Sequence, residues 1–166
     1  LKAGILMFNV ESPGELRQLD RVAQELGLKA PVALRVNPDV DPETHPYIAT
    51  GLKSSKFGIP ISRAVAEYEA AVRLPGIDVV GVQMHIGSQL TKTSPYADSV
   101  SRVADLVETL RARGIQLRYL DAGGGLGIRY KDETPPSQAE LGSVLLPFAV
   151  RLGVTLILEP GRSIVG

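Results

Sequence analysis

The sequence predicts an α/β fold that forms part of a (β/α)8 barrel, and three observations support this. Five short apolar runs alternate with four helical patterns, which is typical of parallel strands joined by helices. No glycine fingerprint follows the first run, which argues against the alternative, a doubly wound open sheet. Polar and glycine-rich residues follow the last three runs, where a barrel carries its active site. A barrel has about 250 residues, so this chain would supply roughly the last five of eight strands.

The first unit has a strand over residues 5–10, a mostly apolar stretch typical of a strand buried on both faces. Ser12 is expected to cap the helix that follows, with Pro13 in the first turn and Glu15 completing a capping box. Apolar residues then recur at helical spacing up to Gly27, which is expected to end the helix.

The second unit opens with a strand over residues 32–36. The polar segment after it, residues 39–55, is too long for a simple connector, and such segments are often functional. The later elements repeat the pattern: helices near residues 62–73 and 96–113, strands over residues 79–84, 117–121 and 155–158, and a helix capped by Ser137 and Glu140 with a bend at Pro147.

Composition excludes several classes of function. The chain has 18 basic and 18 acidic residues, which argues against a nucleic-acid-binding or polybasic membrane-binding protein. It has no cysteine, which removes disulfides, thiolate metal sites and cysteine nucleophiles and fits a reducing compartment such as the cytoplasm. No apolar stretch is long enough to span a membrane. The first residues resemble neither an initiator segment nor a signal peptide, so the sequence is expected to be the middle of a longer protein.

A run of glycines, residues 123–125 and 127, follows the fourth strand. Consecutive glycines let the backbone turn sharply and present N–H groups that can cradle phosphate. A flexible or tightly packed turn is the structural alternative. The position at a strand end favours the phosphate interpretation.

The fifth strand ends in Glu159-Pro160-Gly161-Arg162. A carboxylate leaving a buried strand is costly unless a cation or strong donor meets it, and a protonated pyridinium nitrogen is such a partner. Gly161 allows close approach to the backbone, and Arg162 can pair with phosphate or carboxylate. The alternative is a structural pair between Glu159 and Arg162 at the barrel rim.

The third strand ends at His85, three residues before Ser88. The ring of His85 could stack on an aromatic cofactor and Ser88 could donate to phosphate, although a lone histidine after an apolar strand is often structural. The other histidine is His45, so neither a multi-histidine site nor a bound metal is expected.

Two basic residues outside these motifs are less informative. Lys56 lies in a polar segment that would not desolvate it, so we expect a solvated or ion-paired lysine rather than a Schiff-base lysine. Arg35 lies near its strand end and points either into the barrel mouth or outward. The motifs together offer a flat-ring contact, a carboxylate for a ring nitrogen and phosphate donors, which are the needs of pyridoxal 5′-phosphate.

Seven motifs in order resemble the diaminopimelate decarboxylase family, which belongs to the alanine-racemase-like, fold type III pyridoxal-phosphate enzymes. They cover nearly the whole chain and are specific as an ordered set: residues 9–12, 34–38, 45–51, 56–58, 85–89, 123–127 and 159–162.

The resemblance implies roles for the site residues. His85 would stack on the pyridine ring, and Glu159 would keep the ring nitrogen protonated. The Arg162 side chain would reach a substrate carboxylate. Ser88 and Gly125 would contact the phosphate of the cofactor, as would the backbone of Gly161 and Arg162, and Pro160 would belong to the same cofactor site. The implied reaction converts meso-2,6-diaminopimelate to L-lysine and CO2, in lysine biosynthesis.

The resemblance also implies parts that the chain does not carry. The Schiff-base lysine belongs to the first barrel strand, and Lys56 does not inherit its role. A C-terminal β-domain would supply further contacts and much of the interface of a homodimer. We therefore expect residues 1–166 to be an incomplete pyridoxal-phosphate-binding barrel domain that is inactive alone.

Other interpretations stay open. Decarboxylases of the ornithine, arginine and carboxynorspermidine types share the scaffold, although Gln89, Pro160 and residues 45–51 favour the diaminopimelate branch over the ornithine and arginine branches. From other classes, the chain could be a non-catalytic pyridoxal-phosphate-binding barrel protein, or a remnant that binds nothing.

Overall fold

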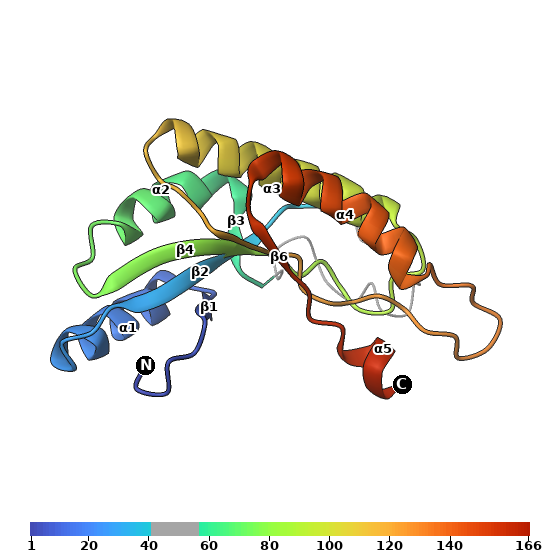
Figure 1. Ribbon diagram of the computed structural model, residues 1–166, viewed down its shortest axis with the longest axis horizontal. Coiled ribbons are helices and arrows are strands. Elements are labelled where there is room, and N and C mark those ends of the chain that lie inside the picture. Colours follow the sequence, from blue (N-terminus) through green and yellow to red (C-terminus); the bar gives the residue numbers. More distant parts are fainter. Residues whose placement is uncertain (41–56) are drawn as a thin grey trace.

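In the computed structural model, which describes residues 1–40 and 57–166, five parallel strands pair side by side in the order of the sequence (Figure 1). A short sixth strand pairs with the end of the second. The five strands are β1 (Phe8–Val10), β2 (Ala30–Asn37), β4 (Ile77–Gln83), β5 (Tyr119–Asp121) and β6 (Thr155–Ile157), and the short one is β3 (Ile59–Pro60).

The strand order places the helices on one face of the sheet. Each crossover between neighbouring strands steps in the same direction, and because such crossovers are right-handed in nearly all proteins, their helices lie on the same side. A doubly wound sheet would need a reversal of direction to cover its second face. Figure 1 shows the sheet curving into an arch with α2, α3 and α4 over its outer surface. The partial barrel predicted from the sequence is confirmed.

The helices are α1 (Pro13–Glu25), α2 (Ile61–Ala71), α3 (Ser94–Ala112), α4 (Gln138–Leu152) and α5 (Gly161–Val165). The capping box of α4 forms as predicted, because Ser137 and Glu140 each accept the other's backbone N–H. At α1, Ser12 Oγ accepts the N–H of Glu15, but the Glu15 carboxylate accepts the N–H of Glu11 at 2.8 Å rather than that of Ser12. The predicted box at α1 is therefore only half right.

Several boundaries differ from those predicted. The first strand begins at Phe8 rather than Ile5, and Ile5 and Leu6 are 48% and 57% exposed. An apolar run predicts burial only if elements lie on both sides of it, and among the described residues β1 pairs with β2 alone. The central strand β2 is longer than predicted, since it has a neighbour on each side. The short β3 and α5 carry no periodic signal and were not predicted.

The core lies between the sheet and the helices that cover it. In β2 and β4 most residues are buried, which fits strands in the middle of a covered parallel sheet. From α2, Tyr68 is fully buried, and its hydroxyl donates to the carbonyl of Gly81 at 2.9 Å. The pairing satisfies the polar group that Tyr68 carries into the core.

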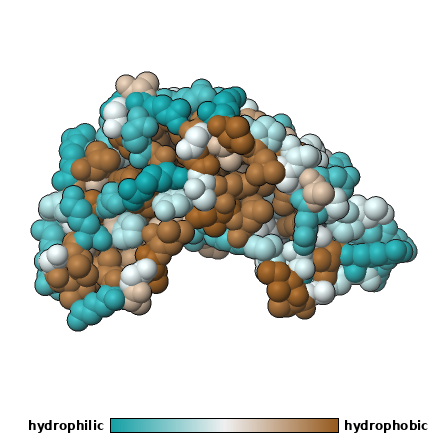
Figure 2. Space-filling model, viewed as in Figure 1, coloured by the Kyte–Doolittle hydropathy of each residue, from teal (hydrophilic) through white to brown (hydrophobic). Residues whose placement is uncertain are grey.

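The concave side of the arch is hollowed (Figure 2). Apolar side chains are exposed on both arms: Ile5 and Leu6 before β1, and Ile164 and Val165 in α5. No described helix is long and apolar enough to cross a membrane.

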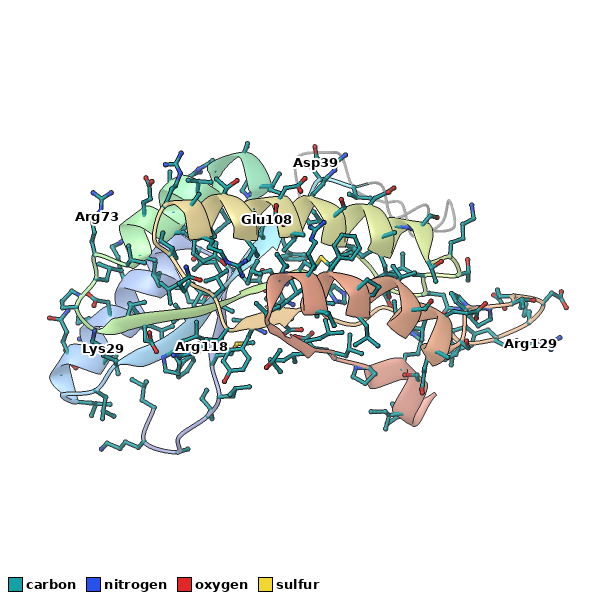
Figure 3. All side chains as sticks on the ribbon, turned by 45° about the horizontal axis from the view of Figure 1, so that its top comes forward. Lys29, Asp39, Arg73, Glu108, Arg118 and Arg129 are labelled. Carbon is teal, nitrogen blue, oxygen red and sulfur yellow. The ribbon has the colours of Figure 1, made fainter. Side chains whose placement is uncertain are left out.

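The two ends of the sheet are chemically distinct. Lys29 and Arg73 precede β2 and β4 and lie at one end of the molecule, whereas Arg129 follows β5 and lies at the other (Figure 3). The carboxyl ends of the strands therefore point toward the end of Arg129, and the motifs singled out in the sequence lie at those carboxyl ends.

Candidate functional site

Backbone hydrogen bonds join the segments that follow β4, β5 and β6. The N–H of Met84 donates to the carbonyl of Asp121 at 2.9 Å, and the N–H of Glu159 donates to the carbonyl of Gly123, also at 2.9 Å. The N–H of Leu90 donates to the carbonyl of Gly125 at 2.8 Å. The histidine, glycine and Glu159–Arg162 motifs consequently meet at one mouth of the barrel wall.

The glycine run is required by close packing. A Cβ on Gly123, Gly124 or Gly125 would lie 2.4, 2.3 or 2.1 Å from a carbonyl oxygen of a neighbouring segment. Gly123 and Gly125 also have positive φ angles of 67° and 103°, which side chains rarely adopt. The tightly packed turn that the sequence left as an alternative is therefore correct for this segment.

The same turn leaves one donor available. The N–H of Gly123 donates to Asp121 Oδ1 at 2.9 Å, and that of Gly124 donates to His85 Nδ1 at 3.3 Å. Among the described residues, the N–H of Gly125 has no acceptor. Packing and anion binding are therefore compatible in this loop, because two amides hold the turn and the third stays available.

His85 is half-buried beside the glycine turn. Because its Nδ1 accepts the N–H of Gly124, that nitrogen carries no proton. Burial, and then the cation of Arg35, lowers the pKa of His85 below its usual value, although Asp121 and Glu11 act in the opposite direction. A neutral imidazole with its proton on Nε2 fits both observations.

Arg162 joins the segments after β4 and β6. Its Nη2 donates to Ser88 Oγ at 2.8 Å, and its Nη1 donates to the hydroxyl oxygen of Tyr130. The guanidinium carbon also lies 5.6 Å from the centre of the Tyr130 ring, within range of a cation–π interaction. The alternative pair between Arg162 and Glu159 does not form.

Carboxylates and amides form a second cluster on the concave side. Asn9 Nδ2 donates to Asp121 Oδ2 at 3.0 Å and to Glu159 Oε1 at 3.3 Å, and Gln83 Nε2 donates to Glu159 Oε1 at 3.5 Å. Asp121 is 2% exposed. Burial, and then the neighbouring Glu159 carboxyl, raises the pKa of Asp121 to about 6, against the lowering effect of N–H donors from Gly123 and Asn9.

Glu159 differs from its sequence prediction in one respect. The argument for a partner rested on burial of this carboxylate, but Glu159 is exposed in the described chain. It follows β6, which has only β5 as a described neighbour, so one side of the strand is uncovered. The amides of Asn9 and Gln83 donate to this carboxylate, and the carboxyl of Asp121 lies beside it.

A hollow of about 430 Å³ lies between His85, beside the glycine turn, and the cluster of carboxylates and amides that includes Gln83 and Glu159. Arg35 faces it, which resolves the orientation left open by the sequence, and its Nη1 donates to Glu11 Oε1 at 2.6 Å. Cavities of about 300–1,000 Å³ commonly hold small ligands. The hollow is lined by Glu11, Arg35, Phe57, Gln83, His85 and Glu159.

Two residues weighed in the sequence, His45 and Lys56, lie outside the described residues. Within residues 1–40 and 57–166, no group of three histidine, aspartate or glutamate side chains could hold a metal ion. Sequence reasoning gave no role to Asn9, Asp121 or Tyr130. Asn9 carried a usable signal, since it is a polar residue inside an apolar run.

The whole chain, residues 1–166, matches the family described as pyridoxal-dependent decarboxylase, pyridoxal binding domain. It is 53% identical over 165 residues to a diaminopimelate decarboxylase of Pseudomonas aeruginosa, covering 99% of this chain and 40% of that protein. A diaminopimelate decarboxylase of Aquifex aeolicus is 52% identical over 163 residues, covering 98% of this chain and 39% of that protein. The chain thus spans about 40% of the length of these relatives.

Solved structures agree with this likeness. The diaminopimelate decarboxylase of Helicobacter pylori complexed with L-lysine superposes with a TM-score of 0.91 at 41% identity, over 99% of this chain and 42% of that chain. A lysine decarboxylase of Selenomonas ruminantium superposes with a TM-score of 0.73 at 24% identity, over 93% of this chain and 38% of that chain, and shows the fold alone.

Proposed function

This chain belongs to the pyridoxal-dependent decarboxylase family, and we propose that it forms the cofactor-binding part of a longer diaminopimelate decarboxylase. The proposed reaction converts meso-2,6-diaminopimelate to L-lysine and CO2. Relatives about half identical to the chain carry that activity in their names, and the similar structure from Helicobacter pylori is complexed with L-lysine. The observation that carries the proposal is the convergence of His85, Gly125, Glu159 and Arg162 at one mouth.

Family membership implies pyridoxal 5′-phosphate as the cofactor, and the mouth fits it. A phosphate needs N–H and O–H donors and a cation, and the mouth has the N–H of Gly125, the hydroxyl of Ser88 and the guanidinium of Arg162. Glycine is required at position 125, since a Cβ there would strike the carbonyl of Gly87 and part the segments that carry Gly125 and Ser88. We assign the phosphate to the N–H of Gly125 and the hydroxyl of Ser88, with the guanidinium of Arg162 pairing either with that phosphate or with a carboxylate of the substrate.

The Glu159 motif contributes unequally to this site. The N–H of Gly161 donates to the carbonyl of Glu159 at 2.8 Å, so Gly161 is a weaker candidate for a phosphate donor than Gly125. Pro160 has no N–H and can only shape the turn. Arg162 contributes its side chain, which would pair with the phosphate or with a carboxylate of the substrate.

Glu159 would hold the proton of the pyridine nitrogen. The amides of Asn9 and Gln83 donate to its carboxylate and orient it beside the carboxyl of Asp121. When bound, pyridoxal 5′-phosphate would stabilise the electron pair left on the α-carbon as CO2 departs, and a protonated ring nitrogen strengthens that effect. The role of Glu159 is therefore to keep the pyridine nitrogen protonated.

His85 would cover a face of the pyridine ring. A neutral imidazole suits this role, because it adds no positive charge beside a cationic ring. The hydrogen bond from Gly124 to Nδ1 fixes the plane of the imidazole before any ligand arrives. His85 is proposed to orient the ring and not to transfer protons.

The experiment that tests the proposal is an assay of the full-length protein that carries this chain. With pyridoxal 5′-phosphate present, we expect CO2 and L-lysine from meso-diaminopimelate and no comparable release of CO2 from L-ornithine, L-arginine or L-lysine. Faster decarboxylation of one of the other three amino acids would move the protein to another branch of the family. Cofactor binding without decarboxylation of any of them would favour a non-catalytic binding protein.

Three further parts of the proposal concern the protein around this chain. We propose that residues 1–166 are an incomplete barrel domain, that the full-length protein is a homodimer, and that it acts in the cytoplasm. The Schiff-base lysine expected from the family has no counterpart assigned in this sequence. The 166-residue chain alone is therefore expected to release no CO2 from diaminopimelate.

A further inference from the structure

We propose that Tyr130 is a positioning residue, which holds the guanidinium of Arg162 in place for an anion at the mouth of the barrel. The proposal rests on the proposed function, because it assigns the anion to that site. The anion is either the phosphate of the cofactor or a carboxylate of the substrate.

Contacts with two neighbours fix the guanidinium of Arg162. Ser88 Oγ accepts from Nη2 at 2.8 Å, and the Tyr130 hydroxyl oxygen accepts from Nη1. The guanidinium carbon lies 5.6 Å from the centre of the Tyr130 ring. These contacts come from the segments after β4 and after β5, so the side chain is held between them. Each terminal nitrogen of an arginine has two hydrogens, and donors therefore remain for an anion.

The charge of Arg162 is not neutralised by these contacts. In residues 1–40 and 57–166, no carboxylate forms an ion pair with Arg162, whereas Arg35 pairs with Glu11. A hydroxyl and an aromatic face hold a guanidinium without competing for its charge. Tyr130 is therefore suited to orient the cation and leave it attractive to an anion.

The segment that carries Tyr130 is itself held in place. Gln89 Nε2 donates to the carbonyl of Ile128 at 2.6 Å, and Gln89 Oε1 accepts the N–H of Ile128 at 3.2 Å. On the other side, the carboxylate of Glu133 accepts the N–H groups of Tyr130 at 3.1 Å and of Lys131 at 2.8 Å. Side-chain hydrogen bonds from Gln89 and Glu133 thus hold the backbone before Tyr130 and at Tyr130 and Lys131.

Gln89 carries a strained backbone for this purpose. Its φ is 59°, a left-handed value unusual for a residue other than glycine. Such a conformation persists only where the surroundings determine it, and the paired hydrogen bonds to Ile128 do so here. The same side-chain amide therefore anchors the segment that positions Arg162.

The test compares Tyr130→Phe, Tyr130→Ala and Arg162→Met in the full-length protein. One measurement is the dissociation constant of pyridoxal 5′-phosphate by equilibrium dialysis, and the other is kcat and KM for meso-diaminopimelate at saturating cofactor. Arg151→Met is the matched control, because Arg151 lies 5.2 Å from the Phe148 ring in a similar pair on the outer helix α4. Thermal unfolding of each variant separates a local effect from a loss of fold.

Tyr130→Phe keeps the ring and removes the hydroxyl, and we expect it to raise either the cofactor dissociation constant or KM about threefold. Tyr130→Ala removes both the ring and the hydroxyl and is expected to raise the same constant about tenfold. A rise in the cofactor dissociation constant alone identifies the phosphate as the anion. A rise in KM alone, with kcat kept, identifies the substrate carboxylate. Arg151→Met is expected to change neither constant.

Two results would overturn the proposal, and they are distinguishable. If Arg162→Met raises either constant at least tenfold while both Tyr130 variants match the wild type, Tyr130 does not position Arg162 and the proposed function stands. If Arg162→Met changes neither constant, the anion does not bind at Arg162, and the inference fails together with that part of the proposed function. If the wild-type protein releases no CO2 but the Tyr130 and Arg162 variants still raise the cofactor dissociation constant, only the proposed reaction is refuted.

Discussion

Replacing Gly125 by alanine tests whether the glycine turn is built for close approach. The new Cβ would lie 2.1 Å from the carbonyl oxygen of Gly87 and 2.9 Å from a methyl of Leu90. Carbon–oxygen contacts are rarely shorter than about 3.3 Å, so the two segments would have to part by roughly 1 Å. That movement separates Gly125 from the segment that carries Ser88.

The expected cost follows from three effects. A side chain at a φ of 103° costs about 1–2 kcal/mol, and the hydrogen bond from Leu90 to the Gly125 carbonyl, 2.8 Å long, is worth about 1 kcal/mol. Parting the packed segments adds to this, so Gly125→Ala should lower the free energy of unfolding by about 3 kcal/mol. Losing an N–H to phosphate should weaken cofactor binding at least about tenfold.

Gly153→Ala is the matched control, because Gly153 has a φ of 65° but no atom within 4 Å of a built Cβ. It should cost only the conformational part, about 1 kcal/mol, and leave cofactor binding unchanged. The assay is urea unfolding of the full-length protein, together with cofactor affinity by equilibrium dialysis. The reasoning is refuted if Gly125→Ala costs no more than Gly153→Ala and binds the cofactor equally well.

Three further predictions concern charge and packing. The folded-state pKa of Asp121 is raised to about 6 from 3.8, so its contribution to stability is present below about pH 4 and lost as pH rises through 6. The free energy of unfolding in urea should therefore fall between about pH 4 and pH 7, and Asp121→Asn should make that pH dependence weaker. Glu159→Gln should lower kcat about a hundredfold or more with a smaller change in KM, since it removes the charge at the ring nitrogen; an unchanged kcat in steady-state assays would exclude that role. Leu34→Ala, at a fully buried position, should lower the free energy of unfolding in urea by about 2–5 kcal/mol. Val150→Ala, at a position 79% exposed, should lower it by under about 0.5 kcal/mol. Equal losses would contradict the assigned core.

The fold was predictable because its signals are local and repeated. Alternating strands and helices indicated a parallel sheet, and the position of the polar motifs favoured a barrel over a doubly wound sheet. The edges were less predictable. Ile5 was assigned to a strand by its apolar neighbours, but it lies outside β1 and is exposed, because a strand also needs a partner that sequence does not reveal.

The placement of the site was predictable only in part. His85, Gly125 and Glu159 follow strand ends, and strand ends of a parallel sheet share one edge. Tyr130 lies in an irregular segment, and its position depends on the pairing of Gln89 with Ile128, which no local pattern encodes.

The central claim is that one mouth of this barrel wall binds a single pyridoxal 5′-phosphate. The most direct measurement is a crystal structure of the full-length protein with the cofactor bound. The claim predicts the phosphate within hydrogen-bond distance of the Gly125 N–H and Ser88, with the ring against His85 and its nitrogen facing Glu159. A cofactor whose phosphate lies away from the glycine turn, or whose ring nitrogen faces a group other than Glu159, would contradict it.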